Sequence, residues 1–121
     1  MTSSGNLAAV QVVNNNFSAS VGDPTSLVSG TWYHVVAVFA SDSSRKIYVN
    51  GNAGTTNTTS ATLAFTPDAF AIGASVRNIA DNYYTGAIDD VRLYNRALSA
   101  ADVYELFSST CPNAPFFGVE F

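Results

Sequence analysis

Charge of either sign is scarce in this sequence. Charged residues make up 12% of the 121 residues, about half the usual share for a soluble domain. Only five residues are Lys or Arg, and the formal net charge is −4. A protein that binds nucleic acid needs a basic patch to displace the counterions of the phosphate backbone. We therefore expect no nucleic-acid partner.

Cysteine and targeting segments are also scarce. Cys111 is the only cysteine, so its thiol is either inert or forms a disulfide between chains. No apolar run is long enough to span a membrane. Residues 1–5 lack the basic and apolar regions of a signal peptide. Either the chain is not secreted by that route, or Met1 heads a truncated sequence.

Hydrophobic residues, by contrast, make up 47% of the chain, which is enough for a core. The length allows one domain at most. Ser, Thr, Asn and Gly supply most of the polarity in place of charged residues. This balance is typical of an extracellular β protein, and we expect a location outside the cell, on a cell surface or on a virion surface.

Short apolar runs between polar turns predict an all-β fold. The best strand covers residues 31–40 (TWYHVVAVFA) and is apolar on both faces, as a strand covered on two sides requires. Asn50-Gly51 is typical of a type I′ hairpin turn. It would join a strand over residues 46–50, with Ile47 and Val49 inward, to a loop or edge strand over residues 52–60. Further strands are predicted over residues 6–13, 17–21, 63–65 and 70–74.

One short helix is predicted after Leu98. Ser99 is the candidate N-cap, and Asp102 at the third helical position completes an Asp variant of the capping box. Leu98 and Val103 have the spacing of a hydrophobic staple. The apolar side of the helix would carry Val103, Leu106 and Phe107, and the helix would end by Ser108 or Ser109.

These elements place one domain over residues 1–110. Residues 111–121 form an apolar tail that we expect to dock on its own domain or on a partner, because such a tail is a liability when exposed.

Residues 87–94 read as a strand in which Val91 and Leu93 face the core together with Asp89. Asp90 and Arg92 share the other face, where we expect an ion pair. Burying the Asp89 carboxylate without a partner would be costly. It therefore needs either backbone N–H groups or a bound metal ion, and the sequence leaves both alternatives open.

Other candidate functional residues have a functional and a structural interpretation. His34, the only histidine, is either a general base or metal ligand, or an imidazole packed beside Trp32. Tyr83 and Tyr84 either stack on a sugar ring or close the end of a sandwich. Asn78 lies in the same predicted loop, residues 75–84, and joins them as a candidate ligand-binding residue.

Two pairs of segments resemble laminin-G-like, concanavalin A-like jelly-roll domains. Residues 32–39 and 47–51 resemble the family's central hairpin, W-x-H-V-A followed by L-Y-V-D-G. Residues 72–73 and 86–99 resemble its closing block almost residue for residue. The resemblance covers roughly residues 7–107. It implies two antiparallel sheets packed face to face as a jelly-roll sandwich, with one short C-terminal helix.

The chain departs from this family at its N-terminal side, because family members carry several strands ahead of the matching region. The sandwich is therefore expected to be incomplete there, as a fragment of a longer protein or as a shortened version. A partner chain, or the tail at residues 116–121, could supply a strand to the open edge. We expect a homo-oligomer or part of a larger chain.

The resemblance implies a function in binding. Family members mostly recognise carbohydrates or proteins, while some relatives are glycoside hydrolases that need two carboxylates around the scissile bond. This sequence has no E-x-D-x-E array, and adjacent Asp89 and Asp90 would point to opposite faces of a strand. We therefore expect a non-catalytic binding or adhesion module that uses Tyr83, Tyr84 and Asn78.

The alternative function is a structural subunit of a phage particle or surface filament, whose chains complete each other's sheets. In related folds an aspartate at the position of Asp89 helps to bind a structural calcium ion. Calcium is thus the one cofactor that the resemblance implies, with its other ligands expected from strands that the chain lacks.

Overall fold

The computed structural model describes residues 7–13, 16–22, 27–60, 71–76, 80–81, 83–110 and 119–120. Within this part lie nine short strands and one helix. The strands are β1 (Ala8–Val13), β2 (Asn16–Gly22), β3 (Trp32–Tyr33), β4 (Val35–Ser41), β5 (Ser44–Val49), β6 (Asn52–Asn57), β7 (Ser75–Val76), β8 (Ala80–Asp81) and β9 (Val119–Glu120). The helix is α1 (Ala100–Thr110).

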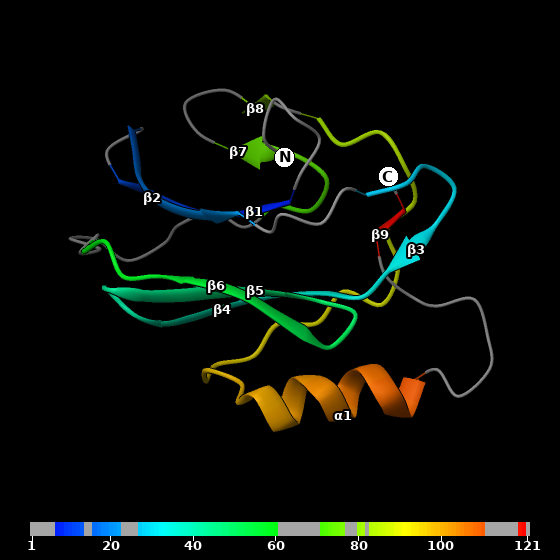
Figure 1. Cartoon of the computed structure of the whole chain (residues 1–121). Helices are drawn as coiled ribbons and strands as arrows, with labels where there is room; N and C mark the ends of the chain where they lie inside the picture. Colours follow the sequence, from blue (N-terminus) through cyan, green and yellow to red (C-terminus); the bar gives the residue numbers. More distant parts are fainter. Residues whose placement is uncertain are drawn as a thin grey trace.

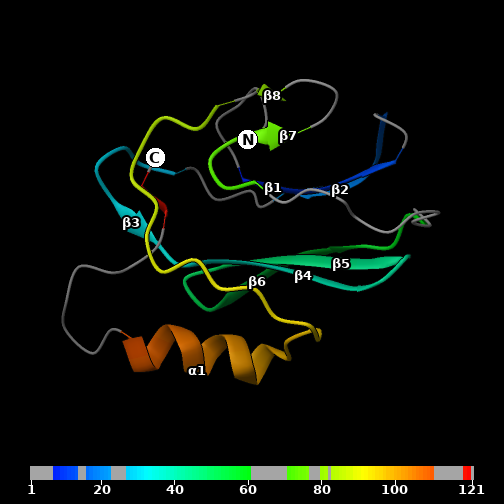
Figure 2. The same cartoon turned by 180° about the vertical axis from the view of Figure 1, so that it is seen from behind.

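A three-stranded antiparallel sheet of order β4-β5-β6 lies at the centre of the molecule. The hairpin β1-β2 covers one face of this sheet, and α1 covers the other, as both views show (Figure 1, Figure 2). Two smaller antiparallel pairs, β3-β9 and β7-β8, lie beside these layers. No helix among the described residues combines the length and hydropathy that crossing a membrane requires.

The β5-β6 hairpin turns at Asn50-Gly51, as the sequence predicts. Asn50 has φ 49° and Gly51 has φ 76°, the positive values that a type I′ turn requires. The Asn50 backbone N–H donates to the His34 carbonyl (2.8 Å). Its side-chain oxygen accepts from the His34 N–H (2.9 Å). The same turn packs against α1, because a Cβ on Gly51 would lie 2.9 Å from the Phe107 ring.

The main core lies between the sheet and α1. It joins Val38 and Tyr48 of the sheet to Leu98 and to the fully buried Val103, with the half-buried Val36 and Leu106 around them. Burying one such aliphatic side chain contributes about 1.5–3 kcal/mol. The predicted staple is confirmed, because Leu98 and Val103 belong to this cluster. On the opposite face, Ile47 packs with Val35 and Leu7.

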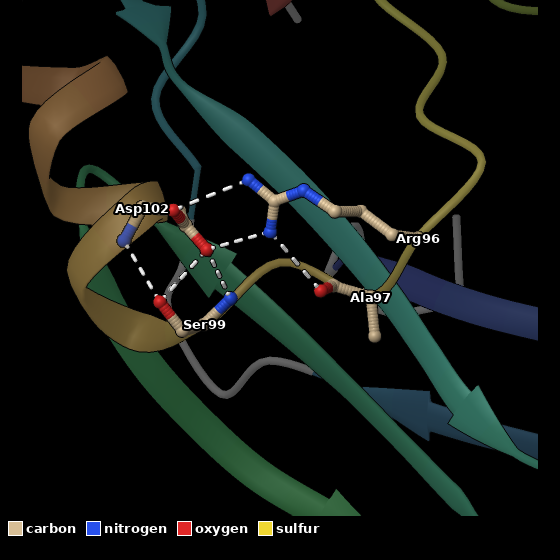
Figure 3. Close-up of polar contacts among 4 residues, drawn as sticks. All are labelled: Arg96, Ala97, Ser99 and Asp102. Atoms are coloured by element: carbon tan, nitrogen blue, oxygen red, sulfur yellow. Dashed lines mark hydrogen bonds and ion pairs between the residues drawn. The ribbon is translucent and has the colours of Figure 1, made fainter.

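The predicted capping box is confirmed at the start of α1 (Figure 3). The Asp102 N–H donates to Ser99 Oγ (3.1 Å), and the Ser99 N–H donates to Asp102 Oδ2 (2.8 Å). Arg96 adds a fork that was not predicted, with Nη1 donating to Asp102 Oδ2 (2.9 Å) and Nη2 to Oδ1 (3.3 Å). These bonds hold the pKa of Asp102 well below its ordinary range, with the Arg96 bonds as the largest cause.

Several predicted strands need adjustment. The run over residues 31–40 divides at His34 into β3 and β4, and the segment after Asn50-Gly51 is the edge strand β6. Of residues 70–74, those described (71–74) form no strand, and the short pair β7-β8 follows within the predicted loop. The predicted strand at residues 63–65 lies outside the described residues, as does the tail except for β9, which pairs with β3.

The predicted strand over residues 87–94 is wrong. Apart from one bridge residue, Ile88, these residues form no strand. Asp90 has φ 48°, in the left-handed region, and this breaks the alternation of side chains that a strand needs. Val91 and Leu93 are consequently 49% and 79% exposed instead of facing the core.

Arg45, the second residue of β5, is fully buried. Its Nη1 donates to Asn57 Oδ1 (2.9 Å) and to the Thr59 carbonyl (2.7 Å). Its Nη2 donates to the Asp42 carbonyl (2.7 Å). The guanidinium therefore ties the β4-β5 turn to the end of β6.

Replacing Arg45 with methionine should destabilise the fold strongly. The Arg45→Met variant keeps much of the side-chain volume but removes the guanidinium bonds to the Asp42 and Thr59 carbonyls and one of the two bonds that Asn57 Oδ1 accepts. A hydrogen bond from a charged group contributes about 1.5–3 kcal/mol, and the bonds lost here are only partly buried, so we expect the free energy of unfolding to fall by about 3 kcal/mol in total. Urea unfolding followed by circular dichroism measures this change.

The matched control is Lys46→Met, which removes the same charge from the next position of β5. We expect a change below about 1 kcal/mol there. Equal losses in the two variants would show that charge, and not the buried hydrogen bonds of Arg45, accounts for the effect.

The capping box should make stability depend on acid. Because folding lowers the pKa of Asp102, its contribution is fully present above the unfolded pKa, about 4, and is lost as pH falls further. Asp102→Asn should therefore lower the melting temperature at pH 6 and flatten its decline between pH 4 and pH 2. Glu105→Gln, an exposed carboxylate on the same helix, is the control that should keep the decline.

Candidate functional site

A groove of about 800 Å³ lies between β4 and the extended segment of residues 88–98. One wall is formed by residues 34–40, the other by residues 88–98, and Leu106 of α1 also lines it. Figure 2 shows the segment in yellow, passing β3 and running beside β4 towards the start of α1.

One end of the groove is polar. Arg92 forks onto Asp90, with Nε donating to Oδ1 (2.9 Å) and Nη2 to Oδ2 (2.8 Å), which confirms the predicted ion pair. The exposed Asp89 carboxylate accepts the N–H of Asp90 through Oδ1 (2.8 Å). The prediction that Asp89 faces the core is wrong, because the residue is exposed. Its carboxylate does have a backbone partner, which was one of the two predicted alternatives. Hydrogen bonds to neighbouring residues therefore fix the side chains of both aspartates.

His34 lies at the same polar end. Its ring packs against Phe107 of α1, with ring centroids 5.9 Å apart. Burial lowers the pKa of His34 below the ordinary 6.5; the charge of Arg92 lowers it further, and Asp90 opposes both effects. The ring is therefore mainly neutral at pH 7. This arrangement agrees with a packed imidazole, with the Phe107 ring as one of its neighbours.

The rest of the groove is apolar and open to solvent. Phe39 on β4 is 48% exposed, and Val91, Leu93 and Tyr94 on the opposite wall are 49%, 79% and 41% exposed. Neighbouring apolar side chains at this exposure are typical of an interaction surface. The sequence carried a signal for this surface in the alternation of Val91 and Leu93 within the closing block.

The predicted ligand-binding tyrosines lie away from the groove. Tyr83 is 71% exposed, whereas Tyr84 is half-buried and donates its N–H to the Gly73 carbonyl (2.8 Å). Neither residue lines the groove. Asn78 lies outside the described residues. Of the candidate residues that the structure describes, Asp89 and His34 line the groove, whereas Tyr83 and Tyr84 do not.

The side chains around Asp89 do not fit the calcium ion that the resemblance implies. Calcium takes six to eight oxygen ligands, usually from several carboxylates and carbonyls. Among the residues that the structure describes, no three His, Cys, Asp or Glu side chains gather as a metal site. One carboxylate oxygen of Asp89 already accepts the backbone N–H of Asp90.

Comparison with known proteins gives a family match over most of the chain. The Laminin_G_3 family model, described as the concanavalin A-like lectin/glucanases superfamily, matches residues 1–104. This confirms the resemblance inferred from the central hairpin and the closing block. No curated protein matches the chain.

One similar solved structure is the 2.1 Å crystal structure of an S-layer domain-containing protein (residues 221–444) from Clostridium thermocellum ATCC 27405. It is 29% identical with a TM-score of 0.57, and the match covers 85% of this chain and 51% of that one. This chain therefore spans about half the length of the structure it resembles.

The buried imidazole at the polar end should be visible in stability measurements. Below the ordinary pKa of histidine, about 6.5, the unfolded chain binds a proton that the folded chain still resists. The free energy of unfolding should therefore be highest above pH 7 and should fall as the pH decreases from 7 to 5. His34→Gln should remove this slope, since the chain has no other histidine.

Chemical denaturation at pH 7, 6 and 5 measures the slope in both proteins. Asp102→Asn serves as the control, because Asp102 titrates below this range. A slope that survives in His34→Gln would contradict the lowered pKa of His34.

Proposed function

The chain belongs to the Laminin_G_3 family of the concanavalin A-like lectin/glucanase superfamily, and we propose that it is a non-catalytic binding module of a cell surface. It recognises a carbohydrate or a protein. The S-layer domain in the name of the similar structure supports the surface location.

The arrangement of carboxylates in the groove is the observation that supports a non-catalytic role. Glycoside hydrolases of either stereochemistry use two carboxyl groups that flank the scissile bond, one of them as proton donor. Among the residues that the structure describes, the carboxylates lining the groove are those of Asp89 and Asp90, which are adjacent in sequence. Asp90 is held by both arms of Arg92, and Asp89 by the Asp90 N–H. Neither is placed to protonate a leaving group across a bound sugar.

The exposed ring of Tyr83 supports carbohydrate recognition. An aromatic face can cover the apolar face of a sugar while the phenol hydroxyl stays in water. The bond from the Tyr84 N–H to Gly73 fixes the backbone next to this ring, which limits the entropy lost on binding. Tyr83 is therefore the primary contact, with Tyr84 beside it and Asn78 as a further predicted contact.

A structural role is the second candidate function. The edge of β4 beside the groove, together with the S-layer relative, favours a subunit whose sheet is completed by another polypeptide. In this role the two-sheet jelly roll becomes complete only in the assembly. Neither candidate role involves catalysis. The ligand is a sugar in the first role and a β-strand of another polypeptide in the second.

Substitution of Tyr83 tests the carbohydrate role. On an array of bacterial and host glycans, Tyr83→Ala should lower the affinity for any bound glycan about tenfold, since sugar stacking is worth about 1.4 kcal/mol. Tyr104→Ala removes a similarly exposed tyrosine, 62% accessible on α1, and should leave affinity unchanged.

An assay for release of reducing sugars from the same glycans runs in parallel. Turnover that disappears in an Asp89→Asn variant would contradict the non-catalytic proposal. An array without any bound glycan would leave protein recognition as the surviving form of the function.

A further inference from the structure

We propose that the groove between β4 and residues 88–98 is the binding site for a single β-strand of a partner polypeptide. This inference rests on the proposed binding function and deepens it, because it names the ligand class and the residues that receive it. The argument begins with the hydrogen-bonding direction of β4.

The backbone groups of β4 alternate between its two sides. The bond from the Asn50 N–H to the His34 carbonyl marks these two residues as a hydrogen-bonded pair of the antiparallel ladder. By alternation along the register, Val36 and Val38 also direct their N–H and C=O groups towards β5, opposite Tyr48 and Lys46. Val35, Ala37 and Phe39 therefore direct theirs to the other side, which is the groove.

That side of β4 has no neighbouring strand within the described part of the chain, where the order of the sheet is β4-β5-β6. A row of strand N–H and C=O groups at an open edge is a template for one more strand. Residues 34–40 all line the groove. At about 3.3 Å per residue, this edge offers about 20 Å of pairing length.

The opposite wall runs in the same direction as β4. The charges of Asp90 and Arg92 act on His34 at the start of β4. Leu98, later in the segment, packs in one cluster with Val38, which is later in β4. A strand that enters antiparallel to β4 is thus antiparallel to residues 88–98 as well. It can form hydrogen bonds to both walls.

The second wall also decides what kind of strand fits. Were a second copy of this chain to dock through its own β4, that copy's β5 would need the space that residues 88–98 occupy. A groove with a wall on each side admits one isolated strand and excludes the edge of a whole sheet. We therefore assign the groove to a lone extended segment and not to a β4-to-β4 dimer.

The side chains of the groove indicate the composition of that segment. Phe39, Val91, Leu93 and Tyr94 are exposed in the absence of a ligand, so apolar residues at alternate positions would cover them. The charge of Arg92 is compensated by Asp90, and that of Arg96 by Asp102. Asp89 remains as a negative charge at the polar end. An antiparallel strand brings its C-terminal end there, where a basic residue is favoured.

The direct test uses a fluorescein-labelled peptide of sequence TVTVTVTK and fluorescence anisotropy. The wild-type chain should bind it, and Ala37→Pro should weaken binding at least tenfold. The proline removes an N–H that faces the groove but no bond of the β4-β5 ladder, a position at which edge strands tolerate proline. Ala53→Pro is the matched control on the edge strand β6, and it should change binding less than twofold.

One further variant and a second peptide keep the test informative if Ala37→Pro folds poorly. Leu93→Asp alters a side chain that is already 79% exposed, so it should fold normally and weaken binding at least tenfold. The peptide TVTVTVTE should bind more weakly than TVTVTVTK at low salt, because it places a carboxylate near Asp89. Amide hydrogen exchange should show that the peptide protects Ala37 and Phe39.

The inference is overturned if the wild-type chain does not bind TVTVTVTK, or if Ala37→Pro and Leu93→Asp bind as tightly as the wild type. Self-association in analytical ultracentrifugation that Ala37→Pro abolishes would assign the edge to a second copy and would also overturn it. Glycan binding that persists while peptide binding fails would leave the proposed function standing without this inference. Sugar hydrolysis would remove the proposed function itself.

Discussion

The packing of α1 against the β4-β5 hairpin is the interaction on which the rest of the structure depends. Val103 is fully buried against Val38 and Tyr48, and Phe107 packs close to the Gly51 turn. The helix start is fixed in turn by Ser99, Asp102 and Arg96. Because Arg96 and Leu98 precede the helix directly, this anchoring also fixes the end of the segment that forms one wall of the groove.

The groove follows from that anchoring. Residues 88–98 are held at their C-terminal end by the core and the capping box, while Arg92 and Asp90 brace the other end against each other. Between these points the segment runs beside β4 without pairing to it. An open sheet edge and an extended chain with exposed apolar side chains therefore face each other. Either feature alone is common at a protein surface, but together they form a site that one further strand could fill.

Features governed by nearby residues could be predicted from the sequence. The Asn50-Gly51 turn, the capping box and the staple each depend on side chains within a few positions, and the structure has all three. Contacts between distant residues could not. The burial of Arg45 depends on carbonyls at Asp42 and Thr59, and that of Tyr48 on a helix some fifty residues later. Nothing in the local pattern around either residue indicates those partners.

The error at residues 87–94 differs in kind, and it bears on function. Alternation of apolar residues predicts a strand, but a strand forms only where a neighbour supplies hydrogen bonds. Here that neighbour is missing, and Val91 and Leu93 remain exposed beside an edge of β4 that is also without a neighbour in the described part of the chain. The strand pattern of residues 87–94 and the structure agree if a strand from a partner binds between β4 and residues 88–98. The segment most strongly marked as a strand by sequence is then the one whose pairing is completed by a ligand.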